Sequence, residues 1–175
     1  MENTKFVQEL QKQVYHFKVK QNFSEIAILC IGTNKLVGDS LGPIVGEKLK
    51  NRLAQKEKIA VYGNMEETLN FKNAKQVLEQ VVTIGKTPFI IGIDSALGKQ
   101  EMVGKIIVGK GKLQIGSALG KKLGYPTHIH IKAVVGTDTK SWQKNIKVLE
   151  QIKNKNIYKI SNDIVEGVCQ ILETV

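Results

Sequence analysis

The feature that most constrains the fold of this chain is the alternation of continuous apolar runs with segments whose apolar residues recur at helical spacing. Four continuous apolar runs, typical of strands buried on both faces, lie at 25–32, 58–63, 87–98 and 127–136. Between them, apolar residues return at helical spacing over 40–53 and over 73–85, where Gly85 gives a stop signal. This alternation predicts an α/β fold, a three-layer α/β/α sandwich whose mixed sheet is mostly parallel.

The rest of the chain adds peripheral elements to that plan. Apolar spacing predicts an amphipathic helix over 3–19, so residues 1–22 form an N-terminal helix appended to a single domain that spans 1–175. The segment 102–111 is expected to form a short antiparallel strand in a hairpin with 87–98. Further helices are expected at 116–123, 141–153 and 157–173.

Charge and composition narrow the classes of partner. The net charge is +10, but Arg52 is the only arginine, the lysines are scattered along the chain, and aromatic residues make up 6%. Base readout favours arginine and single-strand binding favours aromatics, so nucleic acid is not the expected partner. No apolar run is long enough to cross a bilayer, and the polar N-terminus is unlike a secretory signal. Cys30 and Cys169 lie in apolar segments and are expected to be buried thiols in a cytoplasmic protein.

The sequence does not match the common catalytic and phosphate-binding motifs. The segment 104–111 has the spacing of the phosphate-binding loop GxxxxGK[ST], but glycine stands where the motif requires serine or threonine. The segment 83–88 contains Gly-Lys-Thr, but Gln80 stands where the motif requires its first glycine. No dinucleotide fingerprint follows the first strand, and no serine elbow is present. His128 and His130 are two apart on a predicted strand and share one face. Packing and hydrogen bonding are the favoured roles for both, with a metal pair as the alternative.

Two carboxylates stand out. Asp39 follows the first strand by a short loop and precedes a helix, and Asp94 lies at the expected carboxyl end of a buried strand. Taken alone, Asp39 fits a helix cap and Asp94 fits a turn. However, ligands of open α/β sheets bind outside the carboxyl ends of the strands, and two neighbouring parallel strands bring both acids to that edge. The pattern therefore favours a functional site.

The residues CIGTNKLVGDSLGPIVGEKLK (30–50) together with FIIGIDSALG (89–98) carry a family resemblance. They resemble the YyaC-type sporulation proteins of spore-forming bacteria, over about 25–135. That family is similar in turn to the spore germination protease and the hydrogenase maturation endopeptidases. The resemblance implies a phosphorylase/hydrolase-like sandwich, a germination-protease-like domain, and a place in a spore-forming cell or its spore compartment.

The resemblance also implies roles for the two acids. In the germination protease the matching positions carry aspartates implicated in catalysis, which points to Asp39 and Asp94. In the hydrogenase endopeptidases the same positions are metal ligands with a third, histidine ligand. The matching segment here, 109–123, has no histidine, so no cofactor is expected. A divalent metal held by Asp39, Asp94 and His130 is the weaker alternative.

The chemistry expected from these residues is peptide hydrolysis. Two neighbouring acids cannot easily both ionise, so one keeps a proton and the other activates water. Asp39, at a helix start, is assigned the ionised role and Asp94 the protonated one. Backbone amides of loop 32–38 are expected to bind the oxyanion, with Thr33, Asn34 and Gly38 as substrate-binding residues. The alternative is a non-catalytic sporulation protein that binds an acidic partner. The sequence does not constrain the oligomeric state.

Overall fold

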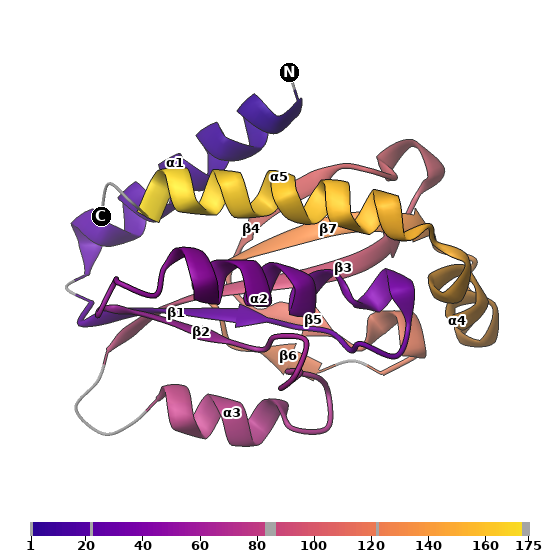
Figure 1. The fold of residues 1–175 in the computed structure, drawn as a ribbon, viewed down its shortest axis with the longest axis horizontal. Coiled ribbons are helices and arrows are strands. Elements are labelled where there is room, and N and C mark those ends of the chain that lie inside the picture. The colour runs from indigo at the N-terminus through magenta and orange to yellow at the C-terminus, as the bar shows by residue number, and fades with distance from the viewer. Residues whose placement is uncertain (1, 22, 83–86, 122, 173–175) are drawn as a thin grey trace.

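The protein has a central five-stranded sheet in a computed structural model that describes residues 2–21, 23–82, 87–121 and 123–172 (Figure 1). The strand order is β2-β1-β3-β7-β4. The strands are β1 (Glu25–Cys30), β2 (Ile59–Tyr62), β3 (Pro88–Gly98), β4 (Ile106–Lys110) and β7 (Ile129–Thr137). All pairs are parallel except β4 with β7. The prediction of a mostly parallel mixed sheet is confirmed.

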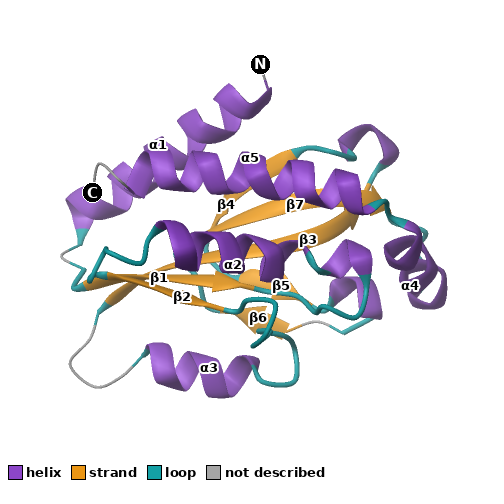
Figure 2. Ribbon diagram, in the orientation of Figure 1, coloured by secondary structure: helices purple, strands orange, loops and turns teal. Residues whose placement is uncertain are grey.

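Helices cover both faces of this sheet (Figure 2). One face carries α1 (Glu2–Lys20), α2 (Leu41–Arg52) and α5 (Asn154–Leu172). The other face carries α3 (Ala74–Val81) and a small antiparallel ribbon of β5 (Leu113–Ile115) and β6 (Leu123–Tyr125). The helix α4 (Trp142–Gln151) lies at one end. None of the helices in the described ranges is long and apolar enough to cross a membrane.

Alternation along the strands divides the interior into two cores. Ile28 of β1, Ile91 of β3 and Ile131 of β7 pack into the core under α1, α2 and α5. Leu29 and Ile90, their neighbours in sequence, pack on the opposite face with the residues of α3 and the β5–β6 ribbon. Both faces of the sheet are therefore buried, which explains why the strands read as continuous apolar runs. The buried thiols expected at Cys30 and Cys169 are confirmed.

The structure corrects the expected hairpin of 102–111 with 87–98. The strand β4 pairs antiparallel with β7, because β7 already occupies the edge of β3. A 3₁₀ turn at Gln100–Met102 and Gly104, with a φ of 89°, carry the chain past β7. The amide of Gly104 donates to the carbonyl of Val134 at 2.8 Å and starts the pairing.

A second correction concerns 116–123, which was expected to be a helix. Only a 3₁₀ turn forms, over Ser117–Leu119, and β6 follows it. Gly116 and Gly120 flank the turn with φ values of 76° and 70°, a left-handed conformation that prevents a helix from continuing. The helix expected over 73–85 ends at Val81 in α3, and its glycine stop, Gly85, lies outside the described residues.

Candidate active site at the carboxyl edge of the sheet

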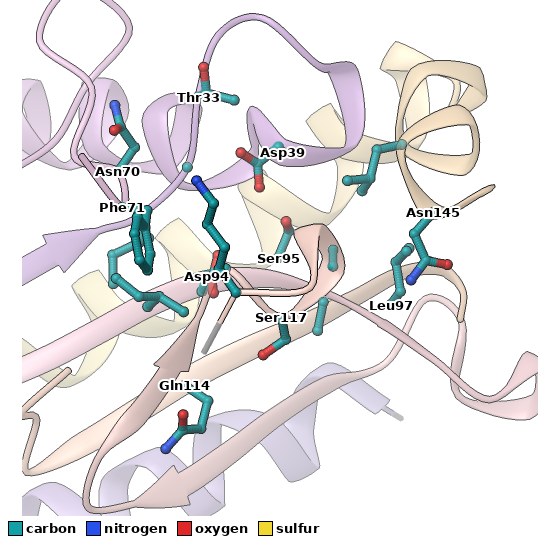
Figure 3. A pocket seen from close by; sticks show the side chains of 18 of the residues that line it. Thr33, Asp39, Asn70, Phe71, Asp94, Ser95, Leu97, Gln114, Ser117 and Asn145 are labelled. Carbon is teal, nitrogen blue, oxygen red and sulfur yellow. The ribbon is translucent and has the colours of Figure 1, made fainter. Parts of the chain in front are cut away.

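A cavity of about 500 Å³ opens at the carboxyl edge of the sheet and includes both Asp39 and Asp94 in its lining (Figure 3). Its walls come from the loop after β1, the second half of β3, the β2–α3 loop, the segment that follows β5, and α4. This is the place where open α/β sheets gather their ligands. The structure therefore brings the two predicted carboxylates together in one cavity.

Asp39 ends a 3₁₀ turn, Val37–Asp39, between β1 and α2. The helix-cap alternative is not realised, because Ser40 stands at the N-cap position of α2, where its hydroxyl donates to the carbonyl of Val37 at 2.7 Å. Gly42 lets α2 begin directly against β1, since a Cβ there would lie 2.0 Å from the carbonyl oxygen of Ile31. The GDSLGP sequence thus fixes Asp39 beside the end of β1.

Asp94 lies within β3, and the strand runs on to Gly98. Both the expected strand-end position and the turn alternative are therefore wrong. A register shift between Ala96 and Leu97 bends the strand beyond the acid. Asp94 is 7% exposed, and its register partner on β7 is Lys132, which also lines the cavity. The carboxyl group is thus held on a rigid, buried strand.

The two carboxyl groups share an electrostatic environment. Burial raises the pKa of Asp39 to about 7, opposed by hydrogen bonds from the Thr33 amide and the Ser95 hydroxyl, which favour the ionised form. Burial also raises the pKa of Asp94 well above its usual range, and the negative charge of Asp39 raises it further. The Lys132 charge and the Ser95 amide partly offset that rise. Burial and the neighbouring charge thus both favour the protonated form of Asp94, whereas the hydrogen bonds to Asp39 favour its ionised form.

The predicted substrate-binding residues fall in different places. Thr33 and Asn34 line the cavity, and the Asn34 side chain donates to the carbonyl of Met65 at 3.0 Å. Gly38 is not among the lining residues. It is buried against α4, and a Cβ there would lie 2.7 Å from the Leu149 side chain. Glycine at position 38 therefore serves close packing.

Loop 32–38 was also expected to supply free amides for an oxyanion. The amide of Gly32 donates instead to the carbonyl of Leu69 at 2.8 Å, and the amide of Thr33 is shared between the Asp39 carbonyl, at 3.0 Å, and the Asp39 carboxyl group. The amide of Lys35 donates to the Thr33 hydroxyl at 3.3 Å. These three donors hold the loop in shape, so they are not available to an oxyanion.

The two histidines lie away from the cavity lining. His128 packs against Phe17, Phe23 and Phe89, and its Nδ1 accepts a hydrogen bond from the amide of Ile90 at 2.9 Å. His130 Nδ1 lies 3.1 Å from the carbonyl oxygen of Gly111. Both side chains serve packing and hydrogen bonding. Within the described ranges, no three His, Cys, Asp or Glu side chains are grouped to hold a metal ion, so the set Asp39, Asp94 and His130 is not assembled.

Sequence reasoning missed most of the lining residues, among them Ser95, Lys132 and Phe71. Ser95 adjoins Asp94 in the sequence, which was a usable signal. Lys132 is two residues beyond His130, so the period of a strand places it on the same face, but nothing local showed that this face meets Asp94. Phe71 lies in a polar loop without periodicity and gave no signal.

Comparison with known proteins identifies the family to which this chain belongs. The model of a family described as "Protein of unknown function (DUF1256)" matches residues 1–167. The chain belongs to the DUF1256 family. It is also 32% identical, over 142 residues, to the "Uncharacterized protein YyaC" of Bacillus subtilis (strain 168), an alignment that covers 81% of this chain and 67% of YyaC. The resemblance to YyaC-type proteins is confirmed.

Solved structures resemble this DUF1256 chain in fold. A [NiFe] hydrogenase maturation protease, HycI from Thermococcus kodakarensis KOD1, aligns with a TM-score of 0.55 and 17% identity, over 89% of this chain and 97% of HycI. A peptidyl-tRNA hydrolase from Acinetobacter baumannii aligns with a TM-score of 0.55 and 11% identity, over 88% and 92%. At such identities the likeness shows the fold alone, an α/β fold shared by a maturation protease and a peptidyl-tRNA hydrolase.

Proposed function

We propose that this protein is a sporulation-associated peptidase in which Asp39 and Asp94 activate water to hydrolyse a peptide bond. The observation that carries the proposal is the shared cavity of two desolvated carboxyl groups, both with raised pKa values, at the carboxyl edge of the sheet. Groups with strongly shifted pKa values, gathered in a cleft, are typical of acid–base catalysis. The proton is assigned to Asp94, because this group is the more deeply buried and faces the negative charge of Asp39.

The proposed reaction uses each carboxyl group in one protonation state. Ionised Asp39 accepts a proton from a water molecule while the water oxygen attacks the peptide carbonyl carbon. Protonated Asp94 donates a hydrogen bond to the carbonyl oxygen and stabilises the charge that develops there. The tetrahedral intermediate then collapses, the carbon–nitrogen bond breaks, and the proton held by Asp39 passes to the leaving amine. Both carboxyl groups return to their starting states.

The residues around the pair support this division of roles. The Thr33 amide and the Ser95 hydroxyl donate to Asp39, which keeps an ionised form accessible near neutral pH despite burial. Asp94 faces the negative charge of Asp39, so loss of its proton is disfavoured. The comparisons support the proposal at the level of fold, since HycI is named as a maturation protease. The sporulation setting rests on the likeness to YyaC-type proteins.

The proposal is tested by incubating the purified protein with peptides prepared from the soluble extract of a spore-forming bacterium. Mass spectrometry then detects new peptide termini. Wild type is expected to generate them, and Asp39→Asn and Asp94→Asn are expected not to. Asp163→Asn is a matched control, because Asp163 lies on α5, 3.4 Å from Lys159 and outside the cavity lining.

Cleavage that persists in both site variants would overturn the carboxylate mechanism. The wild-type protein can also be immobilised on a column and exposed to the same peptides. If it binds peptides there but generates no new termini in solution, the non-catalytic alternative replaces the peptidase proposal. Retention must then weaken when an acidic competitor is added, because the alternative expects an acidic partner for a chain of net charge +10.

A further inference from the structure

Phe71 is an exposed aromatic ring at the wall of the cavity. It lies on the loop between β2 and α3 and is 38% exposed. In Figure 3 the two carboxylates lie between Phe71 on one side and Leu97 with Asn145 on the other. Phe71 therefore forms one wall of the cavity that holds Asp39 and Asp94.

The loop that carries Phe71 is held by its own side chains. The Asn73 carboxamide accepts from the amide of Asn70 and donates to the carbonyl of Thr68, both at 2.8 Å. The Asn70 side chain in turn accepts from the amide of Lys72 at 3.0 Å. These bonds fix the loop before any ligand binds. A fixed ring loses little conformational entropy on binding, which favours a recognition role.

A second loop supports the ring from behind and adds charge. Gly116 approaches it so closely that a Cβ there would lie 3.2 Å from Phe71 Cδ2. The ammonium group of Lys121 lies 5.0 Å from the centroid of the Phe71 ring, within cation–π range. Lys72 and Lys121 both line the cavity. Lys121 thus places one positive charge over the ring, and Lys72, next to Phe71 in the chain, adds a second positive charge to the cavity lining.

We propose that Phe71, Lys72 and Lys121 form a subsite that binds an apolar side chain together with an adjacent carboxylate of a peptide. The apolar group packs on the ring, and the carboxylate meets the two ammonium groups. The placement of this subsite beside a scissile bond rests on the proposed peptidase function, whereas the binding itself does not. The subsite would select where along a chain the peptidase cuts.

A peptide fits this surface better than a nucleic acid does. Phe71 is the one aromatic residue among the described residues that line the cavity, and no arginine lines it. Single-strand binders stack successive bases on several rings. Asp39, in its ionised form, also lies in the same cavity and would repel a run of backbone phosphates. A short peptide with one apolar residue and one acid meets the ring and the lysines without that conflict.

The binding step is tested by NMR with N-acetyl-L-phenylalanine, which carries one ring and one carboxylate. We expect its addition to wild type to shift the amide signals of residues 70–72 and 115–121 selectively. N-acetyl-L-phenylalaninamide, which lacks the charge, is the matched ligand and is expected to bind about two- to fivefold more weakly, the range of an exposed charge contact. Lys121→Gln is expected to remove this preference in part.

Variants complete the test. Phe71→Ala is expected to abolish the shifts, whereas Tyr15→Ala, which removes a 69% exposed ring on α1, leaves them unchanged. The proposal is overturned if wild type shows no shifts in these two loops, or if the charged and neutral probes bind equally. Tighter binding of an eight-nucleotide oligothymidylate at the same loops would assign the surface to nucleic acid instead. None of these binding measurements depends on cleavage, so their outcome is independent of the peptidase test.

Discussion

Two acidic regions line the same cavity and give their carboxylates opposite environments. Asp39 and Asp94 are desolvated, and both pKa values are raised. Asp138, after β7, accepts hydrogen bonds from the Lys140 amide at 2.9 Å and the Asn145 side chain at 3.0 Å, and its other oxygen lies 2.7 Å from Lys140 Nζ. These donors lower the pKa of Asp138 to about 2.

The difference separates a structural acid from a pair of candidate catalytic acids. Asp138 closes the turn into α4 and stabilises the fold in its charged form. The other two acids are held where the charged form is disfavoured, so they reduce stability at neutral pH. Carboxyl groups that cost stability and share a cavity are typical of functional sites. Variants of the three acids test this difference between a structural and a catalytic carboxylate.

The largest expected effect is on turnover. Asp39→Asn and Asp94→Asn are each expected to lower kcat/KM by about 10²–10⁴-fold, the usual contribution of a positioned acid or base. Asp138→Asn is expected to change kcat/KM by less than about threefold, since its carboxylate is occupied by hydrogen bonds. Steady-state kinetics on a peptide found in the cleavage experiment provide the measurement. Equal losses in all three variants would erase the contrast.

The pH dependence of activity comes next in size. Asp39 must be ionised to accept a proton, and burial places its pKa at about 7. We therefore expect kcat/KM to fall about tenfold per pH unit below that value, and to fall again at high pH when Asp94 loses its proton. A profile of kcat/KM between pH 5 and 9 measures the fall on the acid side. Activity that stays level from pH 7 down to pH 5 would show that Asp39 is not the base.

A smaller effect concerns stability at the acid pair. The pKa of Asp39 is raised in the folded state from 3.8 to about 7, so the folded protein holds the proton more tightly than the unfolded chain. The contribution of Asp39 to stability is therefore fully present below about pH 4 and is lost as the pH rises through about 7. Asp39→Asn removes this loss and is expected to raise the free energy of unfolding by roughly 1–2 kcal/mol at pH 8. Urea denaturation at pH 8 and pH 4 is the measurement, and destabilisation at pH 8 would contradict it.

The smallest effect has the opposite sign, at Asp138. Its pKa is lowered in the folded state to about 2, so its contribution to stability is present above pH 4 and is lost as the pH falls through 2. Asp138→Asn is expected to lower the free energy of unfolding by about 0.5–1 kcal/mol at pH 7, in line with exposed hydrogen bonds. Thermal unfolding at pH 7 and pH 2 tests this. If Asp138→Asn melts at the same temperature as wild type at pH 7, Asp138 does not stabilise the fold.

Local sequence patterns predicted most of the fold because strands and helices leave their period in a short window. The runs at 25–32 and 87–98 became β1 and β3, and the helical spacing of 40–53 became α2. Partner choice was less accessible, since β4 was assigned to the wrong neighbour. Pairing depends on which strand already occupies an edge, and that strand, β7, follows β4 in the chain. The three-residue strands β5 and β6 were too short to show a period.

The candidate site divides in the same way. The sequence by itself determined that Asp39 follows one buried strand and that Asp94 lies in another, because continuous apolar runs mark both strands; that β1 and β3 are neighbours was decided by the tertiary structure. Only the tertiary structure decided which charges surround them, how deeply they are buried, that Lys132 adjoins Asp94, and that Ser95 donates to Asp39. It alone also brought Lys121 over the ring of Phe71. Burial and Coulombic coupling arise from residues far apart in the chain, so no local window of sequence contains them.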